Sequence, residues 1–245
     1  MKKSLFNKFI DNVKTIFYAL IIALIIRSLL IQPFYIPSSS MEPTLLIGDR
    51  IFVTKYSYGY SNHSFPFSPS IFKSRLLNQK PTRGDLVVFK TPADNRTDYI
   101  KRLIGLPGDT IQFINGKIFI NQKPIKRNGI VTSQKIRCGM YDYKSISYEE
   151  ILPNGIKYIA AYNSEGSMQN SDLYKVPDNH YFLLGDNRDC SKDSRYLSSV
   201  GYVNELNLVG KARIIFFSND SIKGSIFKFW NLGNSLRLNR FFKKI

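Results

Sequence analysis

The chain has 245 residues, of which 43% are hydrophobic and 14% aromatic, so its composition excludes an intrinsically disordered protein. This length suits one domain, or one domain with an insertion. The formal net charge of +17 indicates an anionic partner. The basic residues are scattered along the chain, and no zinc-finger spacing or RNA-binding signature accompanies them. We therefore expect the partner to be a membrane surface and not a nucleic acid.

The first element in the chain is the apolar run "IFYALIIALIIRSLLI" at residues 16–31. At 1.5 Å per residue it covers roughly 24 Å, and Val13 and residues 34–36 would extend it toward the ~30 Å of a bilayer core. Arg27 lies near its end, from where a long side chain reaches the headgroups. We predict one membrane-spanning anchor over residues 15–33, with a cleaved signal peptide or a buried core helix as alternatives.

The flanks of this run predict its orientation. Lys2, Lys3, Lys8 and Lys14 precede it against the single acid Asp11. Positive charge stays on the cytoplasmic side, so residues 1–14 are expected in the cytoplasm and everything after Pro33 outside the membrane.

After residue 40 the pattern changes to short strands. "RIFVTKYSYG", "GDLVVFK", "HYFLLGDN" and "LVGKARIIFFS" each predict a strand, and "TIQFINGKIFINQKP" predicts a hairpin that turns at Asn115-Gly116. The expected fold class is mostly β: an antiparallel sheet domain behind one N-terminal transmembrane helix.

Two segments lack this periodicity. Residues 61–82 are rich in Ser, Pro and Phe and predict a long loop, and residues 126–175 predict an insertion or small subdomain away from the sheet. The main domain would then comprise residues 34–125 and 176–245. Its tail from Ile226 mixes aromatic and basic residues, and either an interfacial position or a docked terminal helix suits it.

The chemistry open to the chain is restricted. Two cysteines exclude a disulfide-dense scaffold and a four-thiolate metal site, so we expect no metal and no cofactor, and a Cys138–Cys190 bridge stays open. The only histidines are His63, in the loop, and His180, at the start of a strand, which leaves a Ser/His/Asp triad without support.

A lysine is the better candidate for a base. Lys101 lies in "DYIKRLIGLPGD", where burial would lower the pKa of its amine, although a solvent-facing lysine is the ordinary alternative. The serines of "IPSSSMEPT", residues 36–44, follow the anchor closely. They are either a polar linker or the site of a nucleophile that needs such a base.

Four segments in order resolve these alternatives: "IPSSSMEPTLLIGDRIFVTKYSYG", "GDLVVFK", "DYIKRLIGLPGD" and "GDNRDCSKDSR". Together they resemble the successive motifs of bacterial type I signal peptidases, and the match covers most of residues 34–120 and 177–217. The resemblance implies a membrane-anchored serine endopeptidase of the bacterial inner membrane with an extracytoplasmic catalytic domain.

The resemblance also implies the site residues. Ser40 would be the nucleophile and Lys101 the general base, with the Ser40 N–H and the Ser38 hydroxyl as oxyanion hole. Ser191 would orient the lysine amine, and Asp193 with Arg195 would be the supporting ion pair. Ser39 stands where many relatives have glycine, and Cys190 where many have asparagine; we expect Cys190 to be a small, partly buried side chain.

Signal peptidases cut preprotein signal peptides after a small-x-small pattern, which requires shallow apolar pockets beside the nucleophile. The substrate would bind as an added strand at a sheet edge. Alternatives are a relative of self-cleaving SOS-type repressors and a non-enzymatic anchored peptide-binding protein. Preprotein preference and oligomeric state are not predicted. The expected pocket walls are Phe34, Ile36, Pro37, Met41, Leu45, Tyr99 and Ile100.

Overall fold

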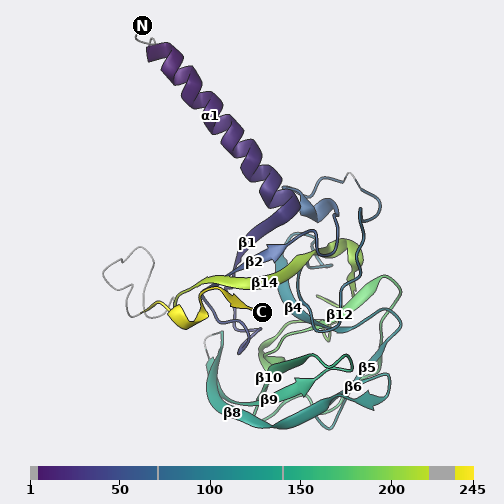
Figure 1. Ribbon diagram of the computed structural model, residues 1–245. Coiled ribbons are helices and arrows are strands. Elements are labelled where there is room, and N and C mark those ends of the chain that lie inside the picture. Colours follow the sequence, from purple (N-terminus) through teal and green to yellow (C-terminus); the bar gives the residue numbers. More distant parts are fainter. Residues whose placement is uncertain (1–4, 71, 140, 221–234) are drawn as a thin grey trace.

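The computed structural model describes residues 5–70, 72–139, 141–220 and 235–245 (Figure 1). One long helix stands clear of a β body in which three antiparallel sheets pack together. The helices are α1 (Leu5–Ile25), a π-helical turn (Ile26–Leu30) and 3₁₀ turns at Asn62–Ser64, Arg188–Cys190, Glu205–Asn207 and Leu238–Arg240. The strands are β1 (Ile31–Tyr35), β2 (Asp49–Thr54), β3 (Leu86–Lys90), β4 (Asp98–Gly105), β5 (Thr110–Ile114), β6 (Lys117–Ile120), β7 (Lys123–Pro124), β8 (Lys126–Cys138), β9 (Tyr141–Ile151), β10 (Lys157–Asn163), β11 (Tyr174–Lys175), β12 (His180–Leu184), β13 (Val203–Asn204), β14 (Leu208–Ser218) and β15 (Lys243–Lys244).

The apolar helix is exposed along most of its length, so it is not the buried core helix considered as an alternative. Its apolar span covers Asn7–Leu30, and 24 residues reach about 36 Å, enough to cross a bilayer core. The prediction that Phe34 to Ile36 extend the helix is wrong, because β1 begins at Ile31. Pro33 explains the early end: it has no N–H to donate and disfavours helical backbone at the residue before it.

The main sheet has the strand order β1-β2-β14-β3-β4-β12-β13, and β15 adds to β14. The run "LVVF" of β3 lies in its middle. Leu86 and Val88 pack into one hydrophobic cluster, and Val87 and Phe89 pack into another. Successive side chains of a strand point to opposite faces, so both faces of this sheet are covered. The sequence prediction of a mostly antiparallel β fold is confirmed.

The predicted hairpin is also present. β5 pairs with β6 in the register Ile114 to Lys117, and both turn residues, Asn115 and Gly116, have positive φ. An asparagine-glycine pair adopts such backbone at little cost, which fixes the tight turn. This hairpin belongs to the four-stranded sheet β11-β5-β6-β7.

Residues 126–163 form a third sheet, with the order β10-β9-β8. β8 and β9 make a long antiparallel ribbon that curves along the lower edge of the body in Figure 1. The sequence of this segment has no clear strand periodicity, and several of the described residues of the ribbon are polar and exposed, among them Lys126, Asn128 and Lys135.

The expected loop at residues 61–82 contains, in its described part, one 3₁₀ turn and an isolated bridge between Tyr60 and Leu76. For the tail from Ile226, both expected alternatives, an interfacial position and a docked helix, concern mainly residues 226–234, which lie outside the described residues. After Ser235 the chain makes a 3₁₀ turn and then β15, whose Lys243 and Lys244 pair with β14.

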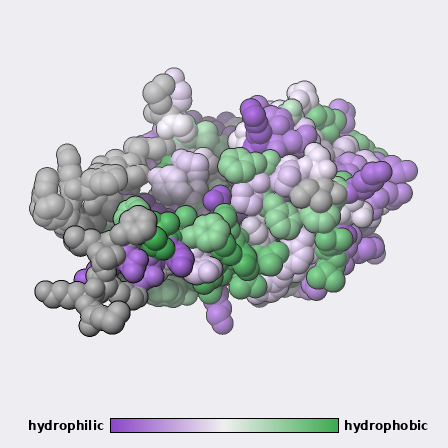
Figure 2. Space-filling view, turned by 90° about the horizontal axis from the view of Figure 1, so that it is seen from above, coloured by the Kyte–Doolittle hydropathy of each residue, from purple (hydrophilic) through white to green (hydrophobic). Residues whose placement is uncertain are grey.

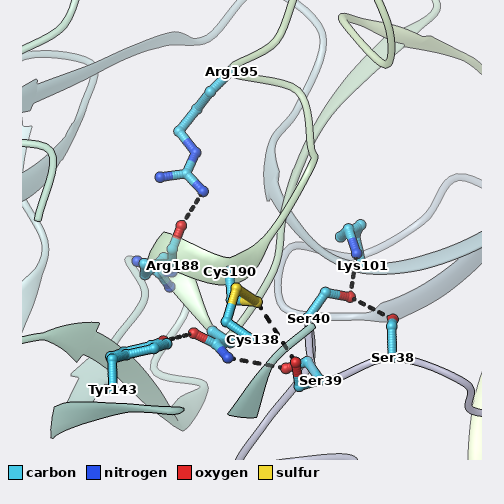
Figure 3. Close-up of a disulfide and its surroundings, with 10 residues drawn as sticks. Ser38, Ser39, Ser40, Lys101, Cys138, Tyr143, Arg188, Cys190 and Arg195 are labelled. Carbon is cyan, nitrogen blue, oxygen red and sulfur yellow. Dashed lines mark hydrogen bonds between the residues drawn. A yellow bond between two sulfur atoms is a disulfide. The ribbon is translucent and has the colours of Figure 1, made fainter. Parts of the chain in front are cut away.

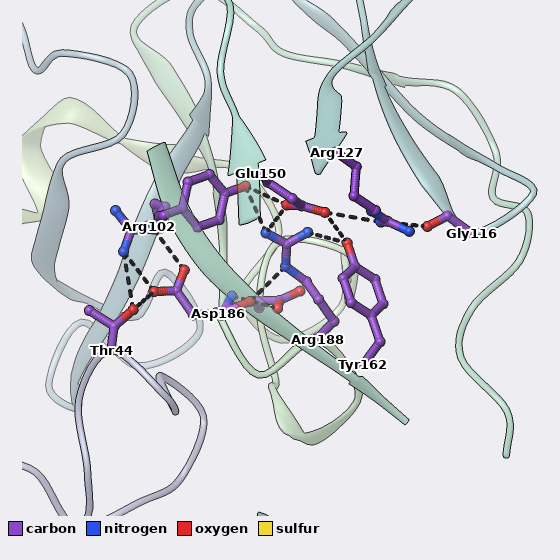
Figure 4. A network of polar contacts seen from close by, with 11 residues as sticks. Thr44, Arg102, Gly116, Arg127, Glu150, Tyr162, Asp186 and Arg188 are labelled. Carbon is purple, nitrogen blue, oxygen red and sulfur yellow. Dashed lines mark hydrogen bonds and ion pairs between the residues drawn. The ribbon is translucent and has the colours of Figure 1, made fainter. Parts of the chain in front are cut away.

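A buried polar network joins the third sheet to the loop after β12 (Figure 4). Arg188 lies 2.8 Å from Glu150 and donates hydrogen bonds to the hydroxyls of Tyr158 and Tyr162. Burial alone would raise the pKa of Glu150, but Arg188 and the two tyrosine hydroxyls outweigh it and lower that pKa. The guanidinium Nε of Arg188 also donates to the Gly185 carbonyl, so the network holds the loop backbone.

We expect Arg188→Ala to lower the free energy of unfolding by about 3 kcal/mol, because the buried Glu150 carboxylate then keeps only Arg127 of its two cations. Urea unfolding of the full chain in a neutral detergent measures this loss. Lys157→Ala, at the exposed start of β10, is the matched control and should change stability by about 0.5 kcal/mol or less. Equal stability of the two variants would contradict the assignment.

Candidate active site

Ser40 and Lys101 meet in the interior of the main domain. Lys101 Nζ lies 2.6 Å from Ser40 Oγ (Figure 3). Lys101 is on β4, opposite Val87 of β3, and only 4% of it is exposed; Ser40 is 9% exposed. The alternative of a solvent-facing lysine is therefore wrong.

Burial sets the proton affinity of this amine. It lowers the pKa of Lys101 to about 8, although the charges of Asp193 and Asp186 act in the opposite direction. The Nζ atom also lies 5.5 Å from the centre of the Tyr99 ring. Since desolvation outweighs the carboxylates, a large fraction of the amine is neutral in mildly alkaline solution.

The serine segment is fixed by backbone contacts from a distant part of the chain. The Asn187 N–H donates to the Ser40 carbonyl at 3.2 Å, and Asn187 Nδ2 donates to the Ser39 carbonyl at 3.1 Å. Ser38 Oγ lies 3.4 Å from Ser40 Oγ on the exposed side. The hydroxyl of Ser38 is thus close to the position of any group that reacts with Ser40.

The residues expected to support Lys101 also lie near it, but Ser191 does not make the expected hydrogen bond. Ser191 Oγ is buried and makes no hydrogen bond within the described residues, so the expected bond to the amine is not seen. A Cβ at Gly185 would lie 2.2 Å from Ser191 Oγ and 2.5 Å from the Ser40 carbonyl, so only glycine fits there. Arg195 pairs with Asp193 at 2.8 Å, and Asp193 accepts a hydrogen bond from the Gly185 N–H.

Cys190 is partly buried, as expected, and the structure answers the question of its pairing that the sequence left open. It forms a disulfide with Cys138, at the end of β8 (Figure 3). Its sulfur lies 3.6 Å from Ser39 Oγ. The bridge ties the tip of the β8–β9 ribbon to the loop that carries Asn187, and Tyr143 of β9 adds a hydrogen bond to Asn187 Oδ1.

Sequence reasoning missed two of these groups, Asn187 and Tyr143, and left the Cys138–Cys190 pairing open. Asn187 lies inside the quoted motif "GDNRDCSKDSR", so the motif itself carried a signal for it. Tyr143 carried no signal, because its importance depends on how the ribbon folds back over the loop. Only the count of two cysteines hinted at the pairing.

A cleft of about 460 Å³ opens beside the serine and the lysine. Leu45 was expected in its wall but is fully buried in the core beneath, with Met41 and Ile51 in the same cluster. The six other expected wall residues do line it: Phe34, Ile36, Pro37, Met41, Tyr99 and Ile100. The cleft also touches residues that were not expected: Tyr35, Ile51, Val88, Thr97, Asp98, Cys190 and Lys192.

Two strands have unpaired stretches at this cleft. β1 is the edge strand of the main sheet and pairs only with β2. β4 pairs with β12 from Arg102 onward, so that among the described strands none pairs with Asp98–Lys101 on that side. Backbone groups from both strands are therefore available to an extended peptide.

Comparison with known proteins identifies the family. The family described as "Signal peptidase, peptidase S26" matches residues 9–217. The Signal peptidase I of Rickettsia typhi is 44% identical over 246 residues, covering 93% of this chain and 90% of that protein. The Signal peptidase I of Rickettsia prowazekii is 43% identical with the same coverage. A crystal structure of a signal peptidase I from Enterococcus faecalis is 28% identical with a TM-score of 0.34, covering 54% of this chain and 97% of that one.

The chain therefore belongs to the S26 peptidases. Within them it is a member of the type I signal peptidase family, as the resemblance of the four motifs indicated.

Two predictions that can be measured follow from the Cys138–Cys190 disulfide. Thiol titration of the unfolded, unreduced chain should detect no free thiol, and two after reduction. Cys138→Ser/Cys190→Ser should lose about 4 kcal/mol of unfolding free energy, because a bridge across 52 residues no longer restricts the unfolded chain. Urea unfolding of the reduced wild-type chain is the control and should match the double variant; two free thiols before reduction would contradict the bridge.

Proposed function

We propose that this membrane-anchored peptidase cleaves signal peptides from exported preproteins, with Ser40 as nucleophile and Lys101 as general base. The observation that carries the proposal is the distance of 2.6 Å between Ser40 Oγ and a lysine amine that is almost completely buried. A hydroxyl attacks a peptide carbonyl only when a nearby base removes its proton. A neutral amine at hydrogen-bond distance meets that requirement.

The reaction then follows from the arrangement. Ser40 Oγ adds to the scissile carbonyl while its proton moves to Lys101 Nζ. The Ser40 N–H and the Ser38 hydroxyl donate to the oxyanion, and removing one such donor typically costs about 10²–10³ in rate. The Lys101 ammonium next protonates the leaving amine, and water hydrolyses the acyl-enzyme by the same proton transfers in reverse order.

Supporting roles are assigned to residues behind the lysine. The Asp193–Arg195 ion pair holds Gly185, whose missing Cβ lets Ser191 and the Ser40 backbone approach each other. We assign Ser191 the orientation of the Lys101 amine. This assignment rests on the motif and on a buried hydroxyl that has no other partner in the described part of the chain.

The cleft supports a preference for small side chains at the cleavage site. Its walls include bulky apolar residues such as Phe34 of β1, Met41 of the serine segment and Ile100 of β4. Larger substrate side chains would clash with them, whereas alanine leaves its methyl group in contact. The free edges of both strands would bind the substrate as an added strand, which fits cleavage after a small-x-small sequence.

We further propose that the N-terminus lies in the cytoplasm and the β body outside the bacterial plasma membrane. The basis is the group of lysines that precede the helix, since positive charge stays on the cytoplasmic side.

Two alternative functions can be compared with this proposal. Family membership and the apolar helix disfavour a self-cleaving repressor. A non-enzymatic peptide-binding protein would not depend on Ser40 or Lys101.

Replacement of the two central residues tests the proposal. Ser40→Ala and Lys101→Met should each lower kcat/KM for a purified preprotein by at least about 10³-fold, with unchanged thermal unfolding, because each removes a group that acts on the reacting atoms. Ser39→Ala is the matched control and should stay within a few-fold of wild type, since in the described part of the chain the Ser39 hydroxyl makes a hydrogen-bond contact only with the disulfide sulfur. Near-normal cleavage by either dyad variant would refute the mechanism.

The pH dependence tests the base independently. Below its pKa of about 8 the Lys101 amine holds a proton and cannot accept another, so kcat/KM should rise with pH through about 8 and then level off. His63→Asn and His180→Asn should leave this profile unchanged. A midpoint near 6.5 that moves with either histidine variant would assign the base to histidine.

A further inference from the structure

A second cavity, of about 710 Å³, lies beside the end of the membrane helix. We call it the basic cavity, after the four cationic side chains that line it: Arg27, Lys55, Lys90 and Arg96. Phe34, Phe65 and Phe67 contribute apolar wall. This cavity is separate from the Ser40–Lys101 pair, although Phe34 and Asp98 line both.

Backbone contacts fix the height of the basic cavity relative to the helix. The Lys55 N–H donates to the Leu30 carbonyl at 3.0 Å, and the Tyr60 hydroxyl donates to the Leu29 carbonyl at 3.0 Å. Since the apolar span ends at Leu30, these residues lie where the hydrocarbon gives way to the headgroups. Figure 1 shows the loop after Tyr60 beside this end of the helix.

The surface around the end of the membrane helix carries both hydrophobic and hydrophilic residues. Figure 2 views the molecule from the side on which the helix rises, and both hydrophobic and hydrophilic residues reach the surface there. The loop exposes Phe67 completely and Leu77 by 77%. An exposed phenylalanine next to clustered cations is a typical composition for contact with a membrane interface.

The charges of the basic cavity are not balanced by the protein. Asp98 is the single carboxylate in its lining, and Lys90 already pairs with it at 2.9 Å. Within the described residues, neither Arg27, Arg96 nor Lys55 has a carboxylate at salt-bridge distance. Three positive charges, those of Arg27, Lys55 and Arg96, thus converge on a cavity whose one carboxylate already pairs with Lys90.

Lys55 is the most buried of these three cations. It is 2% exposed, and its amine donates only to the Ser64 carbonyl, at 2.7 Å. Burial, and next the charge of Arg27, lower the pKa of Lys55 to about 8. A bound anion would oppose both effects on the pKa of Lys55 by supplying a counter-charge.

We propose that the basic cavity binds the phosphate of an anionic phospholipid headgroup at the membrane surface. Guanidinium groups match phosphate oxygens in geometry, so Arg27 and Arg96 would contact the phosphate from the exposed side and Lys55 from the buried side. The phenylalanine wall would contact the glycerol and the first acyl carbons. Because Phe34 also lines the cleavage cleft, a lipid held here would fix the orientation of that cleft to the membrane.

Native mass spectrometry of the full chain in a neutral detergent tests the proposal, with dihexanoyl-phosphatidylglycerol and dihexanoyl-phosphatidylcholine as probes. Wild type should retain one phosphatidylglycerol with at least about tenfold preference. Arg27→Gln/Arg96→Gln should lose most of that preference, since each cation near the surface contributes several-fold to anionic-lipid affinity. Both side chains are exposed, so the fold should persist, and the thermal unfolding curve verifies this.

Lys117→Gln/Lys123→Gln is the matched control, because it removes the same charge from exposed positions on β6 and β7. It should bind phosphatidylglycerol like wild type. Glycerol 3-phosphate is the soluble competitor, and it should not displace the lipid at equal concentration. Equal retention of the two lipids, equal behaviour of the two double variants, or displacement by glycerol 3-phosphate would each overturn the proposal.

Discussion

The removal of water from one lysine amine is the condition on which the site depends. In solution the Lys101 side chain would carry a proton almost permanently, and in the mechanism that we propose Ser40 would then lack a base. β4 places the lysine between β3 and the loop after β12, where its burial outweighs two nearby carboxylates. Asp193 is further neutralised by Arg195, which limits its power to keep the amine protonated. The Asp193–Arg195 ion pair therefore has two effects: Arg195 offsets the charge of Asp193, and Asp193 holds the backbone at Gly185.

Three distant segments of the chain must meet for this environment to exist. The serines come from the segment after β1, the lysine from β4, and the supporting loop follows β12. The β8–β9 ribbon adds a disulfide and the Tyr143–Asn187 hydrogen bond to that loop, and Glu150 adds a buried ion pair with Arg188. A sheet that contributes no reacting group thus contributes stiffness to the backbone around Ser40.

The parts of this structure that sequence could predict are those with local or motif-level causes. The hairpin follows from Asn115-Gly116, the strands from short apolar runs, and the serine and lysine from four motifs in order. The end of the anchor was misjudged because apolar content continues past Leu30 while Pro33 already forbids the helix. Leu45, Tyr143 and the disulfide depend on which face of a segment turns inward after the sheets pack, and the sequence pattern carries no such information.

The direct passage from helix to strand links the anchor to the cleft. The π-helical turn at Ile26–Leu30 leads into β1 with no intervening linker, and β1 is itself a wall of the cleft. A flexible linker would let the body rotate freely above the bilayer. Here the five residues of β1 rise only about 17 Å from the helix end, so the cleft stays close to the membrane surface. The hydrogen bonds from Lys55 and Tyr60 to the last helical carbonyls then resist bending at the one junction where the anchor and the body could move against each other.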